Sequence, residues 1–215
     1  MKLHNFFRSS ASWRVRIALN LKGLTYEYVS VHLRRNGGEQ FAPEFRALNP
    51  HALVPVLDDN GERLTQSLAI IEYLDEVHPD PPLLPKGVTD RARVRALALD
   101  IACDLHPLNN LRVLNYLTKT LGASDEAKAA WYQHWVALGL EALEAQLASS
   151  HHTGQFCHGN APTLADCCLV PQLYQARRFE CDLSGYPTLL AIEQNCSGLP
   201  AFQAAAPERQ PDAEQ

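Results

Sequence analysis

Three serines and an arginine stand close together near the N-terminus, in the stretch "NFFRSSASWRVRIAL" (residues 5–19). Arg8 follows two aromatic residues that end a predicted strand, and Ser9, Ser10 and Ser12 precede a run with helical spacing. A plain surface turn would favour Gly, Asn or Pro. Serine hydroxyls at a helix N-terminus instead add donors where backbone N–H groups and the helix dipole already favour an anion. The spacing therefore predicts an anion site, to which Arg8 adds positive charge.

A second strand-to-helix junction occurs in "QSLAII", where Gln66 and Ser67 precede the apolar run. Ser67 can be an ordinary N-cap, or it can offer its hydroxyl and backbone N–H to a ligand carboxylate. The stretch "TLADCC" has the form of a capping box, with Thr163 as the cap and Asp166 reaching back. We interpret that third junction as structural.

A proline interrupts the apolar run "LVPVL", residues 53–57. Because proline lacks a backbone N–H, the run is either an edge strand or bulge, or it contains a cis Val54–Pro55 bond that exposes the backbone of Val54 to a ligand. The residues alone leave both readings open.

Three arginines from separate segments form a second candidate constellation: Arg8, Arg112 in "HPLNNLRVL" and Arg178 in "QARRFE". Each alone is typical of a solvated surface charge. Together they can bind a dianion, because the guanidinium fork matches a carboxylate. His106, beside Pro107, is interpreted as a packed or capping histidine rather than a proton shuttle.

The composition narrows the class of protein. The chain has 215 residues, 46% of them hydrophobic, and a formal net charge of −5, which argues against a nucleic-acid partner. No apolar run reaches the roughly 18 residues of a membrane span, and "MKLHNFFRSS" lacks the apolar core of a signal peptide. The six cysteines form no C-x-x-C pair, so we expect reduced, mostly buried thiols, a cytoplasmic protein and no metal site.

The elements that must position these residues fall into two halves. Residues 1–80 predict βαβ, a connection and then ββα, with a helix end at Gly23 and a hairpin turn at Asp59–Gly61. The last helix of this half has an apolar face that carries Ile70, Ile71 and Leu74. Four prolines around residues 79–85 predict a linker. Residues 87–215 predict an all-α domain whose first long helix bends near Pro107 and whose second is capped by Ser124. The polar tail "APERQPDAEQ" predicts a frayed end.

The stretches "SSASWRVRIAL", "ALNPHALVPVL", "QSLAIIEYL", "LLP", "TLADCCLVPQ" and "RFECDLSGYP" resemble, in this order, the zeta class of glutathione transferases, the family of maleylacetoacetate isomerases. The resemblance covers nearly the whole chain. It implies an α/β thioredoxin-like domain that binds glutathione at residues 1–80, an all-α substrate-side domain at residues 87–215, and a homodimer.

The resemblance also assigns roles to individual residues. It implies that Ser9 is the hydroxyl nearest the glutathione sulfur, with Ser10 beside it, and that Ala11 stands where the family often has a cysteine. The further cofactor contacts that it implies are the backbone of Val54 ahead of a cis Pro55, and Gln40, Asn49, Gln66 and Ser67. In relatives that act on maleylpyruvate, the positions of Arg8, Arg112 and Arg178 face the substrate carboxylates; His106 joins this candidate set.

The function that this resemblance implies is glutathione-dependent cis–trans isomerisation of maleylacetoacetate to fumarylacetoacetate, a small dicarboxylic acid of aromatic amino-acid breakdown. Maleylpyruvate, from gentisate breakdown, is the second substrate. Two other functions stay open: a transferase or dehalogenase that consumes glutathione on halogenated acids, and a non-catalytic interaction protein. Retention of Ser9, Gln66 and Ser67 disfavours the interaction protein.

Overall fold

The computed structural model describes residues 1–214. Internal contacts divide the chain into two compact units. Unit 1 comprises residues 1–84 together with 197–215, and unit 2 comprises residues 85–196. The sequence placed a second domain at residues 87–215, whereas the contacts group the last segment with the N-terminal residues.

Unit 1 is built on a four-stranded sheet with the order β2-β1-β3-β4. Its first two strands are parallel, and the β1–β3 and β3–β4 pairs are antiparallel. Asn60 and Gly61 form the β3–β4 turn with φ of 54° and 89°, the positive values that a two-residue hairpin turn requires. The predicted βαβ–ββα order is confirmed; the strands are β1 Lys2–Asn5, β2 Glu27–Ser30, β3 Val56–Asp59 and β4 Glu62–Thr65.

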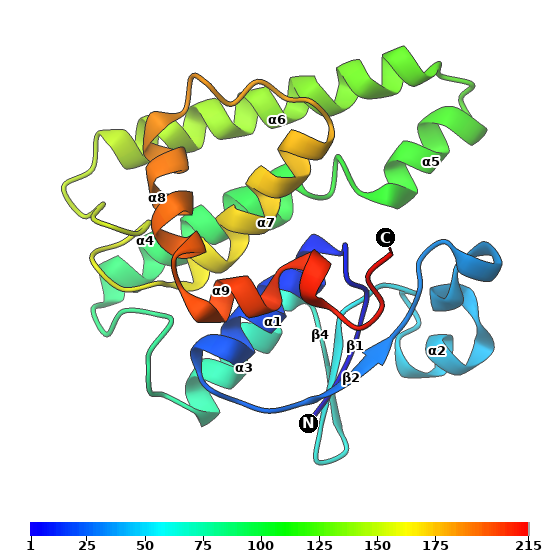
Figure 1. The fold of residues 1–215 in the computed structure, drawn as a ribbon, viewed down its shortest axis with the longest axis horizontal. Coiled ribbons are helices and arrows are strands. Elements are labelled where there is room, and N and C mark those ends of the chain that lie inside the picture. The colour runs from blue at the N-terminus through cyan, green and yellow to red at the C-terminus, as the bar shows by residue number, and fades with distance from the viewer. Residues whose placement is uncertain (215) are drawn as a thin grey trace. The chain divides into compact units, whose positions relative to one another are not determined.

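Helices α1 (Ser10–Leu21) and α3 (Ser67–Val77) pack against each other on one side of this sheet, and α2 (Pro43–Leu48) lies on the other (Figure 1). The predicted apolar face of α3 is confirmed, because Ile70, Ile71 and Leu74 are all buried. Helix α1 ends before Gly23, whose φ of +65° suits glycine after a helix. The short helix α9 (Pro200–Ala205) packs on α1.

An apolar cluster on the α2 side of the sheet joins the end of β1 to β3. Its buried members are Phe6, Phe7, Val31, Phe45, Val54 and Val56. Phe7 directly precedes the serine turn (residues 8–12), and Val54 lies in the proline loop (residues 53–57). The same packing therefore fixes both candidate site segments.

Unit 2 contains only helices within the described residues, as the sequence predicts: α4 Val88–Leu99, α5 Leu111–Lys119, α6 Asp125–Ala148, α7 Leu164–Arg178 and α8 Pro187–Ser197. The prediction of one long helix bent near Pro107 is wrong. A π-helical turn follows α4, the backbone leaves the helix at 106–110, and Asn110 caps a separate α5 by accepting the Arg112 N–H at 3.1 Å. Proline removes a backbone donor at this point, and Asn110 then supplies a new helix start.

Two predicted caps in unit 2 are confirmed. Ser124 Oγ accepts the Ala127 N–H at the start of α6. Thr163 and Asp166 form the capping box of α7, in which the Asp166 carboxylate also accepts the Cys157 N–H at 2.8 Å. The structural interpretation of that junction holds, because its polar groups are used within the fold.

The prediction of a frayed C-terminus is wrong for residues 206–214. Gln210 is buried, and its side chain donates to the carbonyls of Ala204 and Ala206 at 2.8 Å each. Ala213 packs against the apolar cluster of unit 1. The polar composition of the tail hid these contacts because its partners lie far away in sequence.

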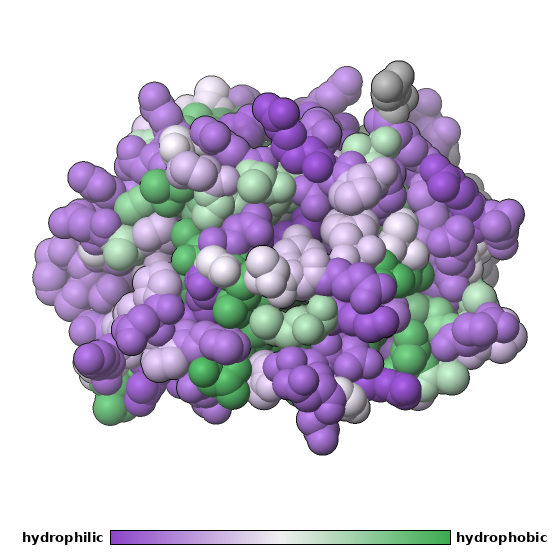
Figure 2. All heavy atoms as spheres, turned by 60° about the horizontal axis from the view of Figure 1, so that its bottom comes forward, coloured by the Kyte–Doolittle hydropathy of each residue, from purple (hydrophilic) through white to green (hydrophobic). Residues whose placement is uncertain are grey.

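The surface exposes few large hydrophobic side chains. One face is mainly hydrophilic, with hydrophobic side chains in small, separate groups (Figure 2). On α4, Val88 and Leu99 are 75% and 44% exposed and lie three helical turns apart on the same face. Among the described residues, none of the helices has the length and apolar character needed to cross a membrane.

Candidate active site

The predicted serine turn opens α1. Ser9 is the N-cap, and its Oγ accepts the Ser12 N–H at 3.2 Å. A hydroxyl that accepts one bond keeps its own proton to donate, so capping leaves Ser9 with a donor. Ser10 is buried as the first helical residue. The first turn of α1 carries no acidic residue, so its positive dipole end is not neutralised from within the helix.

A buried arginine that the sequence reasoning missed braces this turn. The Arg16 guanidinium donates to Asn5 Oδ1 at 2.9 Å and to the carbonyls of Phe6 and Phe7 at 3.3 and 2.8 Å. It also donates to the Ala205 carbonyl at 3.1 Å. Burial lowers the pKa of Arg16 to about 10, so the group stays charged at neutral pH. The arginine fixes the backbone that delivers Arg8 and Ser9; its helical position suggested only a surface charge.

Of the two roles that the sequence left open for Ser67, that of N-cap is excluded, and the role in ligand binding stays a prediction. Gln66 is the N-cap of α3, and Ser67 is the first helical residue. Gln66 has φ of 68°, a left-handed conformation that is uncommon outside glycine and occurs at ligand-binding positions. Ser67 is buried, and its Oγ accepts from Arg14 Nη1 at 3.3 Å. Arg14, also buried, is a second residue that the sequence reasoning missed, and it brings positive charge to this helix N-terminus.

The proline loop leads into β3. The Val54–Pro55 bond is cis, as the resemblance implied; a second cis bond, Asp80–Pro81, was not foreseen. Val54 is buried and lies two residues before Val56, which begins β3 and pairs with His4 of β1. Asn49 Nδ2 donates to the Leu53 carbonyl at 2.8 Å, and its Oδ1 accepts the His51 N–H. Asn49 therefore shapes the loop that carries Val54.

Gln40 supplies a buried polar atom that its own surroundings do not satisfy. Its Nε2 lies 3.5 Å from the Leu33 carbonyl, and its Oε1 has no hydrogen-bond partner within the described part of the chain. Gly38, at φ of +110°, lets this side chain fold back, because a Cβ there would stand 2.7 Å from Gln40 Nε2. A buried orphan acceptor is costly unless a ligand or water meets it, which fits an amide or ammonium donor from a cofactor.

Arg8 has the Phe7 ring beneath it, 4.6 Å from the guanidinium carbon to the ring centroid. Its Nη2 forms an ion pair with the Glu214 carboxylate. The predicted positive charge beside Ser9 is therefore partly neutralised in this structure by the C-terminal segment.

The remaining predicted substrate residues lie in unit 2. Arg112 is exposed in the first turn of α5, and Arg178 is exposed at the end of α7, where its Nη1 donates to Gln175 Oε1 at 3.0 Å. His106 is half-buried, and its Nε2 lies 3.4 Å from Asn110 Nδ2. Their predicted roles remain predictions.

Unit 2 also contains a hollow of about 650 Å³ lined in part by Glu141, Glu180 and Asp182. Three carboxylates disfavour a dianionic acid there, since like charges repel. This hollow therefore does not suit a dicarboxylate ligand.

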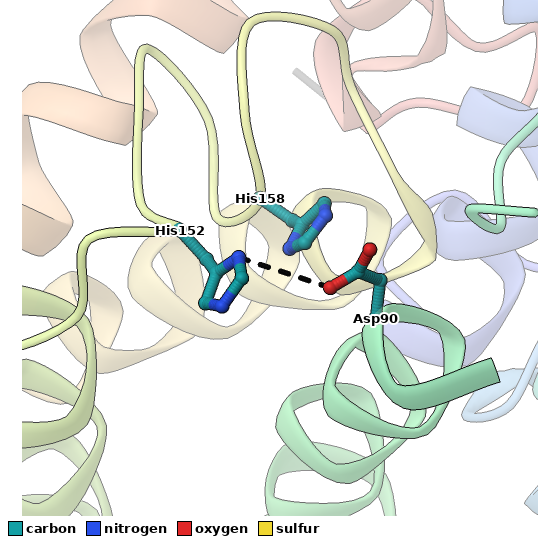
Figure 3. Close-up of side chains that lie close together, drawn as sticks. All are labelled: Asp90, His152 and His158. Atoms are coloured by element: carbon teal, nitrogen blue, oxygen red, sulfur yellow. Dashed lines mark ion pairs between the residues drawn. The ribbon is translucent and has the colours of Figure 1, made fainter. Parts of the chain in front are cut away.

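One cluster in unit 2 has the side chains of a metal site. Donor atoms of Asp90, His152 and His158 lie within 4.8 Å of one another, and their side chains converge (Figure 3). However, Arg93 Nη1 lies 3.2 Å from His158 Nδ1 and donates to the Cys157 carbonyl at 2.8 Å. Burial and Arg93 lower the pKa of His158. The fixed positive charge of Arg93 beside His158 would repel a metal cation. We therefore interpret the cluster as structural, holding in place the loop that carries His152 and His158.

The six cysteines are free, and four of them are buried. Burial raises the pKa of Cys181 to about 11 and raises the pKa values of Cys157, Cys167 and Cys196 further. A protonated, enclosed thiol is a poor nucleophile. The geometry therefore favours a thiol supplied by a cofactor over a protein thiol.

Comparison with known proteins matches residues 3–82 to the N-terminal domain and residues 125–203 to the C-terminal domain of glutathione S-transferase. A probable maleylacetoacetate isomerase of Vibrio cholerae is 56% identical over 98% of this chain and 97% of its own length. A solved holo maleylpyruvate isomerase, a bacterial glutathione S-transferase of the zeta class, is 51% identical, covers both chains completely and has a TM-score of 0.97.

The chain belongs to the zeta class of the glutathione S-transferase family. This confirms the predicted family, fold class and enzyme class, that of glutathione-dependent cis–trans isomerases. A solved maleylacetoacetate isomerase of Methylobacterium extorquens AM1, 41% identical with full coverage of both chains and a TM-score of 0.96, holds malonate and glutathione. A dicarboxylate and glutathione are therefore bound together in a solved relative of this chain.

Proposed function

We propose that this protein isomerises maleylacetoacetate to fumarylacetoacetate with glutathione as its cofactor. The observation that carries the proposal is the N-cap of α1, where Ser9 keeps a hydroxyl proton at an unneutralised helix N-terminus. That arrangement suits a thiolate, which needs a donor and positive potential.

Glutathione fits the residues of unit 1. Gln40 Oε1 offers a buried acceptor without a protein partner. Ser67 and the backbone at Gln66 open a helix N-terminus that Arg14 supports, which suits the γ-glutamyl carboxylate. Val54 offers its backbone to the cysteinyl portion. When bound, glutathione supplies a thiolate nucleophile that adds to the cis double bond and leaves after the bond has rotated.

The side chains divide the remaining work. The Ser9 hydroxyl donates a hydrogen bond to the sulfur and so stabilises the thiolate, with Ser10 as the neighbouring candidate. Arg8, Arg112, Arg178 and His106 are the proposed contacts of the acid, whose carboxylates match guanidinium groups. Arginines also stabilise the negative charge that develops on the substrate oxygen.

We propose a homodimer as the working form. Its support is the zeta-class membership and the two exposed hydrophobic side chains of α4, Val88 and Leu99. Sedimentation velocity on the wild type and on a V88E/L99E variant tests it, with a dimer and a monomer as the expected results. The six free cysteines suit a reducing compartment, and we propose the cytoplasm.

Maleylpyruvate is the second candidate substrate, because a maleylpyruvate isomerase aligns over the whole chain at 51% identity. A turnover assay with both cis acids, with and without glutathione, tests the proposal. We expect activity only with glutathione, a higher kcat/KM for maleylacetoacetate, and no net loss of thiol over many turnovers. Stoichiometric loss of thiol would instead indicate conjugation or dehalogenation, and activity without glutathione would contradict the proposed cofactor role.

A further inference from the structure

The C-terminal segment, residues 210–214, is held against the rest of unit 1 by hydrogen bonds, apolar packing and ion pairs. Gln210 bonds to the end of α9, and Ala213 packs against the apolar cluster that includes Phe6 and Phe7. In Figure 1 the end of the chain returns to the β1–β2 side of the sheet. A segment held at several points has a defined place, so its charged residues have defined partners.

Asp212 anchors the segment to the sheet. Its carboxylate accepts from the Tyr28 hydroxyl, from Ser30 Oγ at 2.9 Å and from the Phe7 N–H at 3.3 Å. Burial and the bond to Asp212 raise the pKa of Tyr28. Because one donor is the residue just before Arg8, Asp212 ties the segment directly to the turn that carries that arginine.

Glu214 places one oxygen on each of two donors. Its Oε2 pairs with Arg8 Nη2, and its Oε1 lies 2.8 Å from His32 Nε2. His32 Nδ1 accepts the backbone N–H groups of Arg34 and Arg35, at 3.2 and 2.8 Å. With Nδ1 used as an acceptor, the ring proton belongs on Nε2, which makes His32 a donor to the carboxylate. The Arg35 guanidinium adds a third positive group at 3.8 Å.

This arrangement is a carboxylate site occupied by the chain itself. His32 is 3% exposed and Arg8 is 23% exposed, so both donors are held by the fold, while Glu214 is 39% exposed at the end of the segment. The bond to His32 and the charges of Arg8 and Arg35 lower the pKa of Glu214, so it is ionised at neutral pH. A second carboxylate brought to Arg8 would meet this negative charge.

We propose that Glu214 is an internal carboxylate that occupies the Arg8–His32 site until a carboxylate of an acidic ligand displaces it. The C-terminal segment then weakens acid binding and sets its affinity, without touching glutathione. The inference rests on the proposed role of Arg8 in binding the acid.

Malonate titration in the presence of saturating glutathione tests the proposal by calorimetry. Glu214→Gln keeps the shape of the side chain and removes its charge, so we expect malonate to bind about fivefold more tightly, the change that a partly exposed ion pair supports. Glu62→Gln, which removes one negative charge from the exposed β3–β4 hairpin, is the matched control and leaves the affinity unchanged. Unchanged or weaker binding in Glu214→Gln overturns the proposal, and weaker binding would mean that Glu214 positions Arg8.

An Arg8→Met variant distinguishes a failure of the proposed Arg8 role in acid binding from a failure of the proposed competition by Glu214. If Arg8→Met binds malonate as the wild type does, the proposed role of Arg8 fails and the internal competition fails with it. If Arg8→Met loses binding while Glu214→Gln changes nothing, the role of Arg8 stands and only the competition fails.

Hydrogen exchange measures the displacement directly. With the wild type saturated with glutathione, malonate should increase amide exchange in the peptide that contains residues 210–214. Glu214→Gln should show faster exchange in that peptide already without malonate. A peptide that exchanges equally or more slowly when malonate binds to the wild type would contradict displacement.

Discussion

The N-termini of α1 and α3 both open a candidate ligand site in unit 1, and a buried arginine of α1 supports each in a different way. Arg16 donates to the side chain of Asn5 and to the carbonyls of Phe6 and Phe7, so it fixes the backbone of the turn before α1. Arg14 donates to a side-chain hydroxyl, that of Ser67, at the longer distance of 3.3 Å. Arg16 therefore holds backbone acceptors in place, whereas Arg14 brings positive charge to the N-terminus of α3, where we propose that a ligand carboxylate binds.

This difference separates stability from binding. A guanidinium that satisfies backbone carbonyls leaves several buried acceptors unpaired when it is removed. The bond from Arg14 to the Ser67 hydroxyl stands at a proposed ligand site, so removing Arg14 takes positive charge away from the ligand there. The two arginines should therefore differ in which measurement their substitution changes.

The largest expected effect is on stability. Arg16→Met leaves the acceptors of Asn5, Phe7 and Ala205 without their donor and leaves the Phe6 carbonyl with the Ser9 N–H alone, and we expect the free energy of unfolding to fall by about 3 kcal/mol or more. Urea unfolding followed by circular dichroism measures it. Arg63→Met, on the exposed β4 strand, is the control and should change stability by less than about 0.5 kcal/mol. A loss below about 1 kcal/mol in Arg16→Met would remove the distinction between the two arginines.

The next effect is on cofactor affinity. Arg14→Met should weaken glutathione binding about tenfold or more, since hydrogen bonds to charged groups contribute roughly 1.5–3 kcal/mol. We expect kcat at saturating glutathione to change little, because Arg14 faces the α3 side and not the Ser9 turn. Calorimetric titration of glutathione and steady-state kinetics test both statements. Wild-type affinity in Arg14→Met would show that Ser67 needs no support from this charge.

The smallest expected effect concerns the protein thiols. Raised pKa values keep Cys157, Cys167 and Cys196 protonated at pH 8, while Cys103 is exposed. Iodoacetamide at that pH should modify Cys103 first and leave glutathione-dependent turnover unchanged. Mass spectrometry of the labelled protein, with activity measured in parallel, tests this. Loss of activity in step with labelling of any one cysteine would contradict a mechanism in which the cofactor supplies the thiol.

Local rules predicted the parts of the fold whose causes are local. The hairpin at Asn60–Gly61, the helix end at Gly23 and the cap at Ser124 each follow from one residue type at one backbone position. At Ser67 the sequence left the cap role open, and the structure excludes it because the left-handed Gln66 takes the cap position. No residue preference indicates that choice.

Contacts between distant residues were not predictable in this way. Arg14 and Arg16 look like ordinary polar residues of a helix, yet Arg14 reaches Ser67 and Arg16 reaches Ala205. Asp212 and Glu214 lie in a polar tail, and their partners belong to the first 35 residues. For the site itself, the sequence indicated Ser9 with Arg8 beside it and the resemblance indicated Gln40, but the buried Arg14 and the carboxylate of Glu214 on Arg8 came only from the folded chain.

The thiol pKa of bound glutathione tests the central claim most directly. It can be measured from the ultraviolet absorbance of the thiolate during pH titration of the holoenzyme. Removing the Ser9 hydroxyl in Ser9→Ala should raise this pKa by about 1–2 units and lower turnover about tenfold or more, whereas Ser9→Thr, which restores the hydroxyl and the cap, should recover much of both. Ser10→Ala should leave the pKa near the wild-type value. An unchanged pKa and unchanged turnover in Ser9→Ala would contradict the account, and a raised pKa in Ser10→Ala alone would transfer the donor role to Ser10.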